Sequence, residues 1–190
     1  MQRGTLDDRD IQRSAAAASD GVIHLAFKHD IAFSGDFQGA ADADRRAVET
    51  FGEALAGTER PFLIAPGMLG VSGYIAEGTN RWPAVHRLDA ARLFRLALET
   101  APAGSVLHAN AEEGVPIRAI AEVIGRHLNL PEAAISPEDA AEHFGFLAGF
   151  LDVDSPASST LTRELLGWQA THAGLIDDLD KGHYCDNPSA

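Results

Sequence analysis

The stretch that decides the fold is DGVIHLAF, residues 20–27. Asp20-Gly21 is a helix-breaking pair, and the six residues after it are almost wholly apolar and begin with two β-branched side chains. A short apolar run after a turn is typical of a strand that is buried on both faces of a sheet. A second run of this kind, PFLIA, occupies residues 61–65. We therefore expect two buried strands in the first third of the chain.

Helical patterns flank these two runs. Residues 6–19 carry acids in the expected first turn and alanines after it, which suits a helix and its dipole. Residues 28–39 contain glycines and are expected to form a loop. Residues 41–56 place apolar side chains at helical spacing, and Gly57 is positioned to end that helix. Helices and short buried strands that alternate along a chain indicate a parallel α/β sheet.

The rest of the chain is expected to be mostly helical. Asp89 is placed to cap a helix whose apolar residues recur at i, i+3, i+4 and i+7. Ser136 is placed to cap another, and a short helix is expected at residues 160–166. The segment SVLHAN, residues 105–110, is a third strand candidate.

Composition excludes several classes of protein. The formal net charge of −13 repels phosphate backbones, so we expect no nucleic-acid partner and no anionic membrane partner. No apolar run approaches the roughly 18 residues of a membrane helix. The start of the sequence does not have the pattern of a signal peptide, and the single cysteine fits a reducing compartment. We expect a soluble cytoplasmic protein.

The segment EGTNRWPAVHRLDAARLFRLALE occupies residues 77–99 and leads into a predicted helix. It resembles the passage from the substrate-binding portion into a helix in the extended or atypical short-chain dehydrogenase/reductase family, also described as NAD-dependent epimerase/dehydratases. This is the most specific match in a resemblance that covers most of the chain. Other matching segments are RGTLDD (3–8), DGVIHLAF (20–27), ERPFLIAPG (59–67), EEGVPIRAIAEVIGRHLNLP (112–131), SSTLTRELLGW (158–168) and GLIDDLDKGHY (174–184). The resemblance implies a Rossmann-like sheet and an NAD or NADP cofactor.

The sequence differs from that family at the residues that bind the cofactor and transfer the proton. Members of the family hold the dinucleotide pyrophosphate with a glycine-rich turn after a first strand, and they transfer a proton with the tyrosine of a Tyr-x-x-x-Lys pair. Here the tyrosines are Tyr74 and Tyr184, the lysines are Lys28 and Lys181, and no tyrosine precedes a lysine by four residues. The serine of the family aligns with Pro66, and PFLIAPGMLG runs almost directly into VSGYIAEGTNRW. Two blocks of the family are therefore missing, and we assign no catalytic residue.

The resemblance implies two groups of binding residues. Leu25, Ala26 and Phe27 stand where the family contacts its cofactor, although the same run also suits an ordinary core strand with one buried histidine. Asn80, Arg81 and His86 border the implied substrate pocket, where an arginine could clamp a carboxylate or phosphate. The alternative for the second group is a structural turn, with the neighbouring tryptophan in the core and the arginine at the surface.

Three further motifs bear on the function. Gly67-x-x-Gly70-x-x-Gly73 imitates a phosphate loop, but the sequence after it cannot make the long helix that such a loop needs, which favours a plain connection. The histidines are scattered and show no paired metal-ligand spacing, so we assign no metal and keep an enzyme based on His/Asp chemistry as a remote alternative. No Gly-x-Ser-x-Gly elbow is present.

We therefore predict an α/β fold, built from part of a Rossmann-like parallel sheet with a helical C-terminal portion. Residues 1–70 form the partial Rossmann-like unit. Residues 71–190 form the substrate region and C-terminal helices, packed with it as one domain. The predicted function is that of a truncated or degenerate NAD(P)-dependent oxidoreductase or epimerase with a small-molecule substrate and little activity. The alternative is a non-catalytic binding or oligomerisation protein, in which a homo-oligomer covers the exposed sheet edges.

Overall fold

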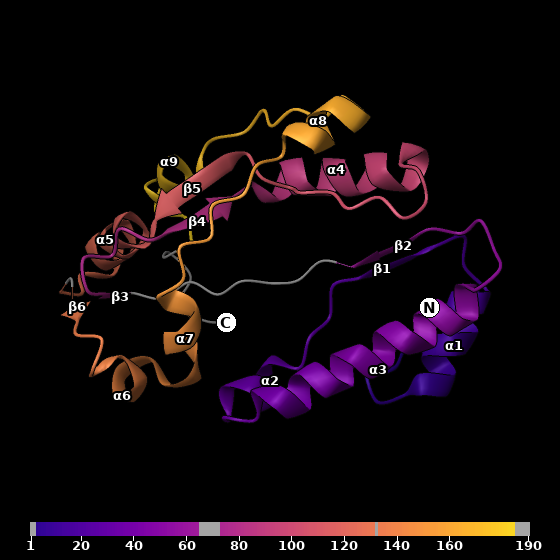
Figure 1. Ribbon diagram of the computed structural model, residues 1–190, viewed down its shortest axis with the longest axis horizontal. Coiled ribbons are helices and arrows are strands. Elements are labelled where there is room, and N and C mark those ends of the chain that lie inside the picture. Colours follow the sequence, from indigo (N-terminus) through magenta and orange to yellow (C-terminus); the bar gives the residue numbers. More distant parts are fainter. Residues whose placement is uncertain (1–2, 65–72, 132, 185–190) are drawn as a thin grey trace. The chain divides into compact units, whose positions relative to one another are not determined.

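The structure is a computed structural model that describes residues 3–64, 73–131 and 133–184. The chain divides into two compact units, Met1–Met68 (unit 1) and Leu69–Ala190 (unit 2). Helices and strands occur in both units, so the protein has a mixed α/β fold (Figure 1). Among the described residues, no helix is long and apolar enough to cross a membrane.

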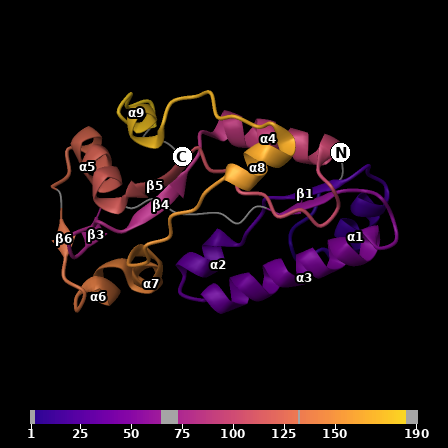
Figure 2. The ribbon, with the colours of Figure 1, turned by 45° about the horizontal axis from the view of Figure 1, so that its top comes forward.

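Unit 1 is a β–α–β arrangement. Its strands pair in parallel, with Val22 opposite Phe62 and His24 opposite Ile64. In Figures 1 and 2 the longest helix lies along this strand pair, with one shorter helix at each of its ends. The elements are α1 (Arg9–Ala17), β1 (Val22–His24), α2 (His29–Phe33), α3 (Phe37–Leu55) and β2 (Phe62–Ile64).

The helices of unit 1 are held by small side chains and by two caps. Buried alanines of α3, among them Ala40 and Ala47, let the other helices approach closely. Asp36 caps α3, since its Oδ1 accepts a hydrogen bond from the amide of Gly39 at 2.8 Å. At the end of α1, Nη1 of Arg60 donates to the carbonyl oxygens of Ala16, Ala17 and Ser19 at 2.9–3.0 Å.

Two predictions for unit 1 need correction. The expected strand over residues 22–27 ends at His24, because the backbone of residues 25–27 has left the ladder with β2. The expected loop over residues 28–39 contains the short helix α2, which begins after Lys28 and packs against α3. The other helices and strands of this unit agree with the prediction to within a few residues.

Unit 2 contains two small sheets and several helices. β3 pairs with β6 in parallel, and β4 pairs with β5 in antiparallel fashion. The elements are β3 (Tyr74–Ile75), β4 (Arg81–Ala84), α4 (Arg87–Thr100), β5 (Glu112–Pro116), α5 (Ile117–Leu128), β6 (Ala134–Ile135), α6 (Ala140–Phe144), η1 (Gly145–Leu147), α7 (Ala148–Leu151), α8 (Thr160–Leu166) and α9 (Leu175–Leu179).

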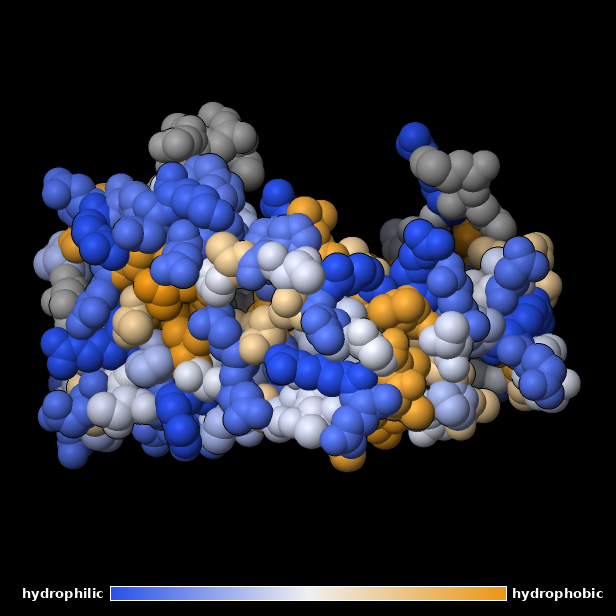
Figure 3. All heavy atoms as spheres, turned by 90° about the horizontal axis from the view of Figure 1, so that it is seen from above, coloured by the Kyte–Doolittle hydropathy of each residue, from blue (hydrophilic) through white to orange (hydrophobic). Residues whose placement is uncertain are grey.

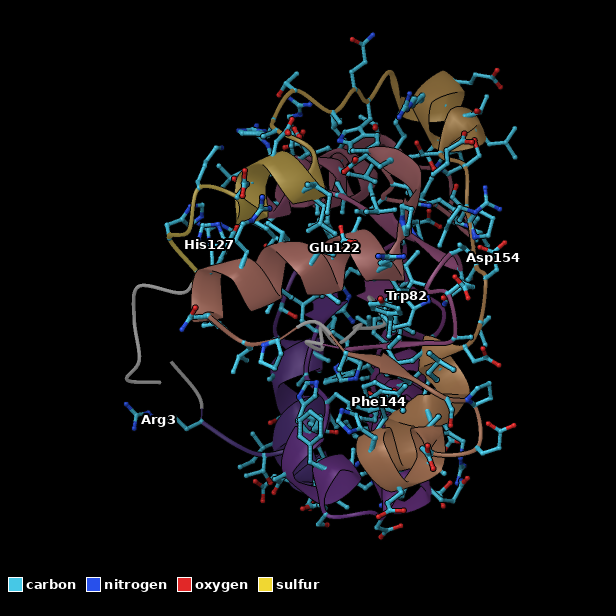
Figure 4. The ribbon with its side chains drawn as sticks, turned by 90° about the vertical axis from the view of Figure 1, so that its left-hand side faces the viewer. Arg3, Trp82, Glu122, His127, Phe144 and Asp154 are labelled. Carbon is cyan, nitrogen blue, oxygen red and sulfur yellow. The ribbon has the colours of Figure 1, made fainter. Side chains whose placement is uncertain are left out.

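Two tryptophans organise the core of unit 2. Trp82 packs against one cluster built on Tyr74 and Ile117 and against a second cluster built on Ile75 and Leu151. Figure 4 shows Trp82 between helix α5 and Phe144, as this packing requires. Trp168 is almost fully buried, and its indole Nε1 donates to the carbonyl oxygen of Asp89 at 3.0 Å.

The predicted strand over residues 105–110 is wrong. This segment is irregular, and β5 follows it at Glu112–Pro116. The reason is that side chains of residues 157–162 meet its polar groups in place of a strand: the amide of His108 donates to Oγ1 of Thr162 at 2.8 Å, and Oγ of Ser159 donates to the carbonyl of Asn110 at 2.5 Å. The short helix predicted at residues 160–166 is confirmed as α8.

The start of α4 also differs from the prediction. His86, and not Asp89, caps this helix, because Nδ1 of His86 accepts a hydrogen bond from the amide of Leu88 at 3.2 Å. Asp89 lies inside the first turn, and its side chain is committed elsewhere. The helix expected directly after Ser136 begins four residues later, at Ala140, after a turn in which Oγ of Ser136 accepts from the amide of Asp139.

Candidate functional site

The predicted cofactor residues follow strand β1. Leu25 exposes 64% of its surface, and the ring of Phe27 contacts the rings of His29 and Phe37 at centroid distances of 5.4 and 6.0 Å. The neighbouring Lys28 is already paired, with Nζ 2.5 Å from Oδ2 of Asp7. This run offers exposed apolar surface, and its adjacent cation is not free to meet a phosphate.

The buried histidine of the same segment has a structural partner. His24 lies in β1 with its side chain buried, and its Nε2 lies 2.7 Å from Oδ1 of Asp44 on α3. The pair therefore ties the first strand to the crossover helix. Of the glycine motif that imitates a phosphate loop, Gly67 and Gly70 lie outside the described residues.

Two of the predicted substrate residues, Asn80 and Arg81, form hydrogen bonds to the segment of residues 151–154. Nδ2 of Asn80 donates to the carbonyl of Leu151 at 2.6 Å. The guanidinium of Arg81 meets both carboxylate oxygens of Asp154, with Nε 3.1 Å from Oδ1 and Nη2 2.9 Å from Oδ2. The backbone amide of Arg81 also donates to that carboxylate at 2.7 Å. Figure 4 shows Asp154 and Trp82 in the same part of this unit.

The charges of this pair support each other. Hydrogen bonding to Asp154 raises the pKa of the Arg81 guanidinium, and the same bonds lower the pKa of the Asp154 carboxyl. Both side chains are about half exposed, so the pair is worth little to stability. It does occupy the Nε and Nη2 edge of the fork that we expected to clamp a substrate anion.

The third predicted residue, His86, lies in a different group of side chains. We call this group the histidine cluster and define it as His86, Asp89, His172, Asp178 and Tyr184. The imidazole rings of His86 and His172 are stacked, with centroids 4.5 Å apart and an interplanar angle of 7°. Each ring lies near a carboxylate, since Nδ1 of His172 is 3.0 Å from Asp89 and Nε2 of His86 is 3.8 Å from Asp178.

Asp89 is the centre of the cluster and is fully buried, with 0% exposure. Its Oδ2 accepts from the amides of Thr171 and His172 at 3.0 and 2.9 Å. Its Oδ1 accepts from Oγ1 of Thr171 at 3.2 Å and lies 3.3 Å from Nη2 of Arg92. Burial opposes ionisation, but the hydrogen bonds from His172, Thr171 and Arg92 outweigh it and hold the pKa of Asp89 below its usual range.

Asp178 accepts hydrogen bonds from two residues near the end of the described chain. Its Oδ2 accepts from the hydroxyl of Tyr184 at 2.7 Å, and its Oδ1 accepts from Nζ of Lys181 at 3.0 Å. The hydrogen bonds from Tyr184 and Lys181 lower the pKa of Asp178, and the bond to this carboxylate raises the pKa of Tyr184. The cluster therefore links the first turn of α4 to the segment of residues 168–184.

The cluster can hold and orient protons. A carboxylate that accepts from Nδ1 of an imidazole fixes its tautomer and leaves Nε2 as a base, as Asp89 does for His172. Two cavities lie away from the cluster, one at the first turn of α1 and one around the start of α5. Within the described residues, no group of three or more His, Cys, Asp or Glu side chains could hold a metal ion.

Sequence reasoning identified only one member of this cluster. The sequence places His86 at the substrate pocket and Asp89 at a helix cap, and it leaves His172 among the scattered histidines. His86 and Asp89 are at least 83 residues away in the sequence from the other three members, which no local pattern reports. The usable signal was an acid within an apolar helical stripe, because a buried carboxylate needs several donors.

Comparisons with known proteins identify close relatives of this chain. The uncharacterized protein C2A9.02 of Schizosaccharomyces pombe is 39% identical, over 95% of this chain and 83% of its own length. The uncharacterized protein YLL056C of Saccharomyces cerevisiae is 35% identical, over 93% of this chain and 81% of its own length. No protein-family model matches the chain.

One solved structure has a similar fold. The X-ray structure of Pal from Bacillus thuringiensis superposes with a TM-score of 0.62 and covers 94% of this chain and 80% of that one. Only 11% of the residues are identical, so the likeness concerns the fold alone.

The alignment with the S. pombe relative is longer than this chain. It runs over 248 positions, which exceeds the 190 residues of this chain by 58. At least that many residues of the relative therefore have no counterpart here.

Proposed function

The chain belongs to the same family as these two yeast proteins, and we propose that it is a shortened relative of the NAD(P)-dependent oxidoreductases and epimerases of the short-chain dehydrogenase/reductase type. In this proposal the chain has little dehydrogenase activity of its own. The parallel β–α–β arrangement of unit 1 supports a partial Rossmann-like sheet. The S. pombe relative has residues without a counterpart in this chain, which supports the view that this chain has lost part of a longer oxidoreductase.

One observation carries the proposal, namely that neither tyrosine is equipped for proton transfer. The family places a lysine four residues after its tyrosine to lower the pKa of the phenol, and this sequence has no such pair. Tyr74 is buried, with the guanidinium carbon of Arg118 5.5 Å from its ring centre. Tyr184 donates to Asp178, which raises its pKa and so disfavours the phenolate that the chemistry needs.

The cofactor is NAD or NADP by resemblance, and the described residues fit it poorly. Leu25, Ala26 and Phe27 offer apolar surface at the end of β1, but Lys28 is paired with Asp7. Arg81, the expected clamp for a substrate anion, is paired with Asp154. We therefore expect any dinucleotide to bind weakly and assign no step of a reaction to it.

Calorimetric titration with NAD⁺, NADP⁺ and their reduced forms tests the proposal. We expect binding weaker than micromolar and no measurable turnover of NAD(P)H. The S. pombe relative serves as the comparison, since it carries the residues that this chain lacks. Rapid NAD(P)H turnover by the pure chain that is lost in Arg81→Ala or His86→Asn would overturn the proposal.

A chimera tests the part that concerns the missing block. The chimera is this chain with those residues of the S. pombe protein inserted that have no counterpart here. If the block completes a cofactor site, the chimera binds a dinucleotide more tightly than the chain itself. A folded chimera with unchanged binding would mean that the block does not serve the cofactor.

The second candidate is a non-catalytic binding or oligomerisation protein, and the strands of unit 1 favour it. Ile23, Leu25 and Ile64 expose 42%, 64% and 49% of their surface, and a two-stranded sheet leaves both edges open. The face in Figure 3 is largely hydrophilic and carries a few groups of hydrophobic side chains. Light scattering would detect a homo-oligomer of the wild-type chain. The Ile23→Lys variant should be monomeric, because a charge on the exposed strand would disrupt the contact. A monomer at all concentrations would count against this candidate.

A further inference from the structure

The cap of helix α4 requires a neutral histidine. Nδ1 of His86 accepts the hydrogen bond from the amide of Leu88, so this nitrogen carries no proton and the ring proton lies on Nε2. Nε2 in turn lies 3.8 Å from Oδ2 of Asp178. The imidazole therefore bridges the first turn of α4 and helix α9 in a single tautomer.

A second proton can enter this ring only at Nδ1. That nitrogen would then present an N–H to the amide of Leu88, and the capping bond would be lost. The new positive charge would also lie at the N-terminal end of a 14-residue helix, where the helix dipole is unfavourable for cations. Both effects oppose the structure seen here whenever His86 becomes charged.

The stacked ring of His172 also disfavours a positive charge on His86. His172 lies face to face with His86 at 4.5 Å, and its Nδ1 is held by Asp89. Two imidazolium rings in this stack would repel each other.

The carboxylates beside the stack attract a second proton, but each already faces a cation. Asp89 faces Arg92, and Asp178 faces Lys181. Arg87 adds a further cation on α4, and its charge reaches Tyr184. Hydrogen bonds lower the pKa values of Asp89 and Asp178, so both carboxylates stay ionised in mild acid.

We propose that the His86–His172 stack is an acid-sensitive latch, which holds residues 168–184 against α4 at neutral pH and loosens both when His86 takes up a second proton. The segment depends on the first turn of α4 through Asp89, which binds the amides of Thr171 and His172. Fraying of that turn therefore frees the backbone that Asp89 holds. This latch does not depend on the proposed oxidoreductase ancestry.

Amide hydrogen exchange between pH 5 and pH 8 tests the latch directly. The reporters are the amides of Leu88, Thr171 and His172, because each donates to the cluster. After correction for the intrinsic pH dependence of exchange, we expect their protection to fall by about tenfold at pH 5, which is the scale of a lost cap. The amide of Gly39 is the matched control, because it donates to a carboxylate that caps α3 and not to an imidazole.

Two further measurements make the test decisive. Nitrogen NMR of the wild-type imidazoles should show His86 protonated on Nε2 alone at pH 8. His86→Asn keeps a capping oxygen without a titratable ring, so its Leu88 amide should lose the acid response, whereas His143→Asn outside the cluster should retain it. A proton on Nδ1 of His86 at pH 8, constant protection of Leu88 in the wild type, or an unchanged acid response in His86→Asn would each overturn the proposal.

Discussion

Replacing Asp89 by asparagine should destabilise unit 2 by roughly 2–3 kcal/mol, because a buried carboxylate that accepts four hydrogen bonds of 2.9–3.2 Å and faces Arg92 at 3.3 Å becomes a neutral amide. The amide oxygen can keep the two backbone donors, from Thr171 and His172. The amide nitrogen then takes the place of Oδ1, which accepts from Oγ1 of Thr171 and from Nδ1 of His172. Two bonds at about 1–1.5 kcal/mol each give the magnitude.

The loss stays below the 3–5 kcal/mol typical of a broken buried ion pair. The reason is that Arg92 and His172 are partly exposed, so water can solvate the partners that asparagine abandons.

Urea denaturation followed by tryptophan fluorescence measures this change. Both tryptophans of the chain, Trp82 and Trp168, belong to unit 2, so the signal reports that unit. With an m value of about 2 kcal/mol/M, the midpoint should fall by roughly 1–1.5 M. Asp180→Asn is the control, since that carboxylate is half exposed and pairs with Arg126 at the surface. Equal midpoints for the two variants would refute the reasoning.

The same variant predicts a pH dependence whose sign follows from the lowered pKa of Asp89. A carboxyl whose pKa is lower in the folded state contributes stability above its unfolded pKa, near 4, and loses that contribution as pH falls through the folded value. The stability difference between wild type and Asp89→Asn should therefore shrink as the pH falls below about 4. A difference that grows in acid would contradict the assignment of the charge.

Two other substitutions test local structure. Arg60→Lys keeps the charge but loses the planar guanidinium, whose Nη1 donates to three carbonyls at the end of α1, so the amides of that last turn should exchange several-fold faster while those of α3 stay unchanged. Gly167→Ala should cost about 1 kcal/mol, because this residue ends α8 at φ 62° with no neighbour within 4 Å. Gly149→Ala, in α7 with equally open space, should be neutral or stabilising by comparison.

The sequence predicted the elements of this fold where local signals decide them. Helix α8 lies where Thr160–Leu166 was expected, since a glycine stop follows a short apolar pattern. Prediction failed where distant side chains decide the backbone. Residues 105–110 have a composition suited to a strand, but Thr162 and Ser159 satisfy their polar groups and leave them irregular.

The same distinction explains the candidate site. His86 could be named because it lies in the segment that carries the resemblance. Its role as a cap was missed because the usual capping residues are Ser, Thr, Asp and Asn, and Asp89 stood close enough to take that role. His172, Asp178 and Tyr184 come close to α4 only through tertiary contacts, so no spacing in the sequence could place them there.

The strand pair of unit 1 has features of an incomplete sheet. Its sheet has two strands, its apolar residues Ile23, Leu25 and Ile64 are exposed, and Gln12 Oε1 is the one buried side-chain atom among the described residues that lacks a hydrogen-bond partner. Two-stranded sheets are marginal in water. If the residues missing against the S. pombe relative once completed this sheet, the amide of Val22, which donates to Pro61, should exchange much faster than the amides held by Asp89 in unit 2. Equal exchange at the two places would mean that unit 1 is stable as it stands, and the missing block would then have served a ligand and not the fold.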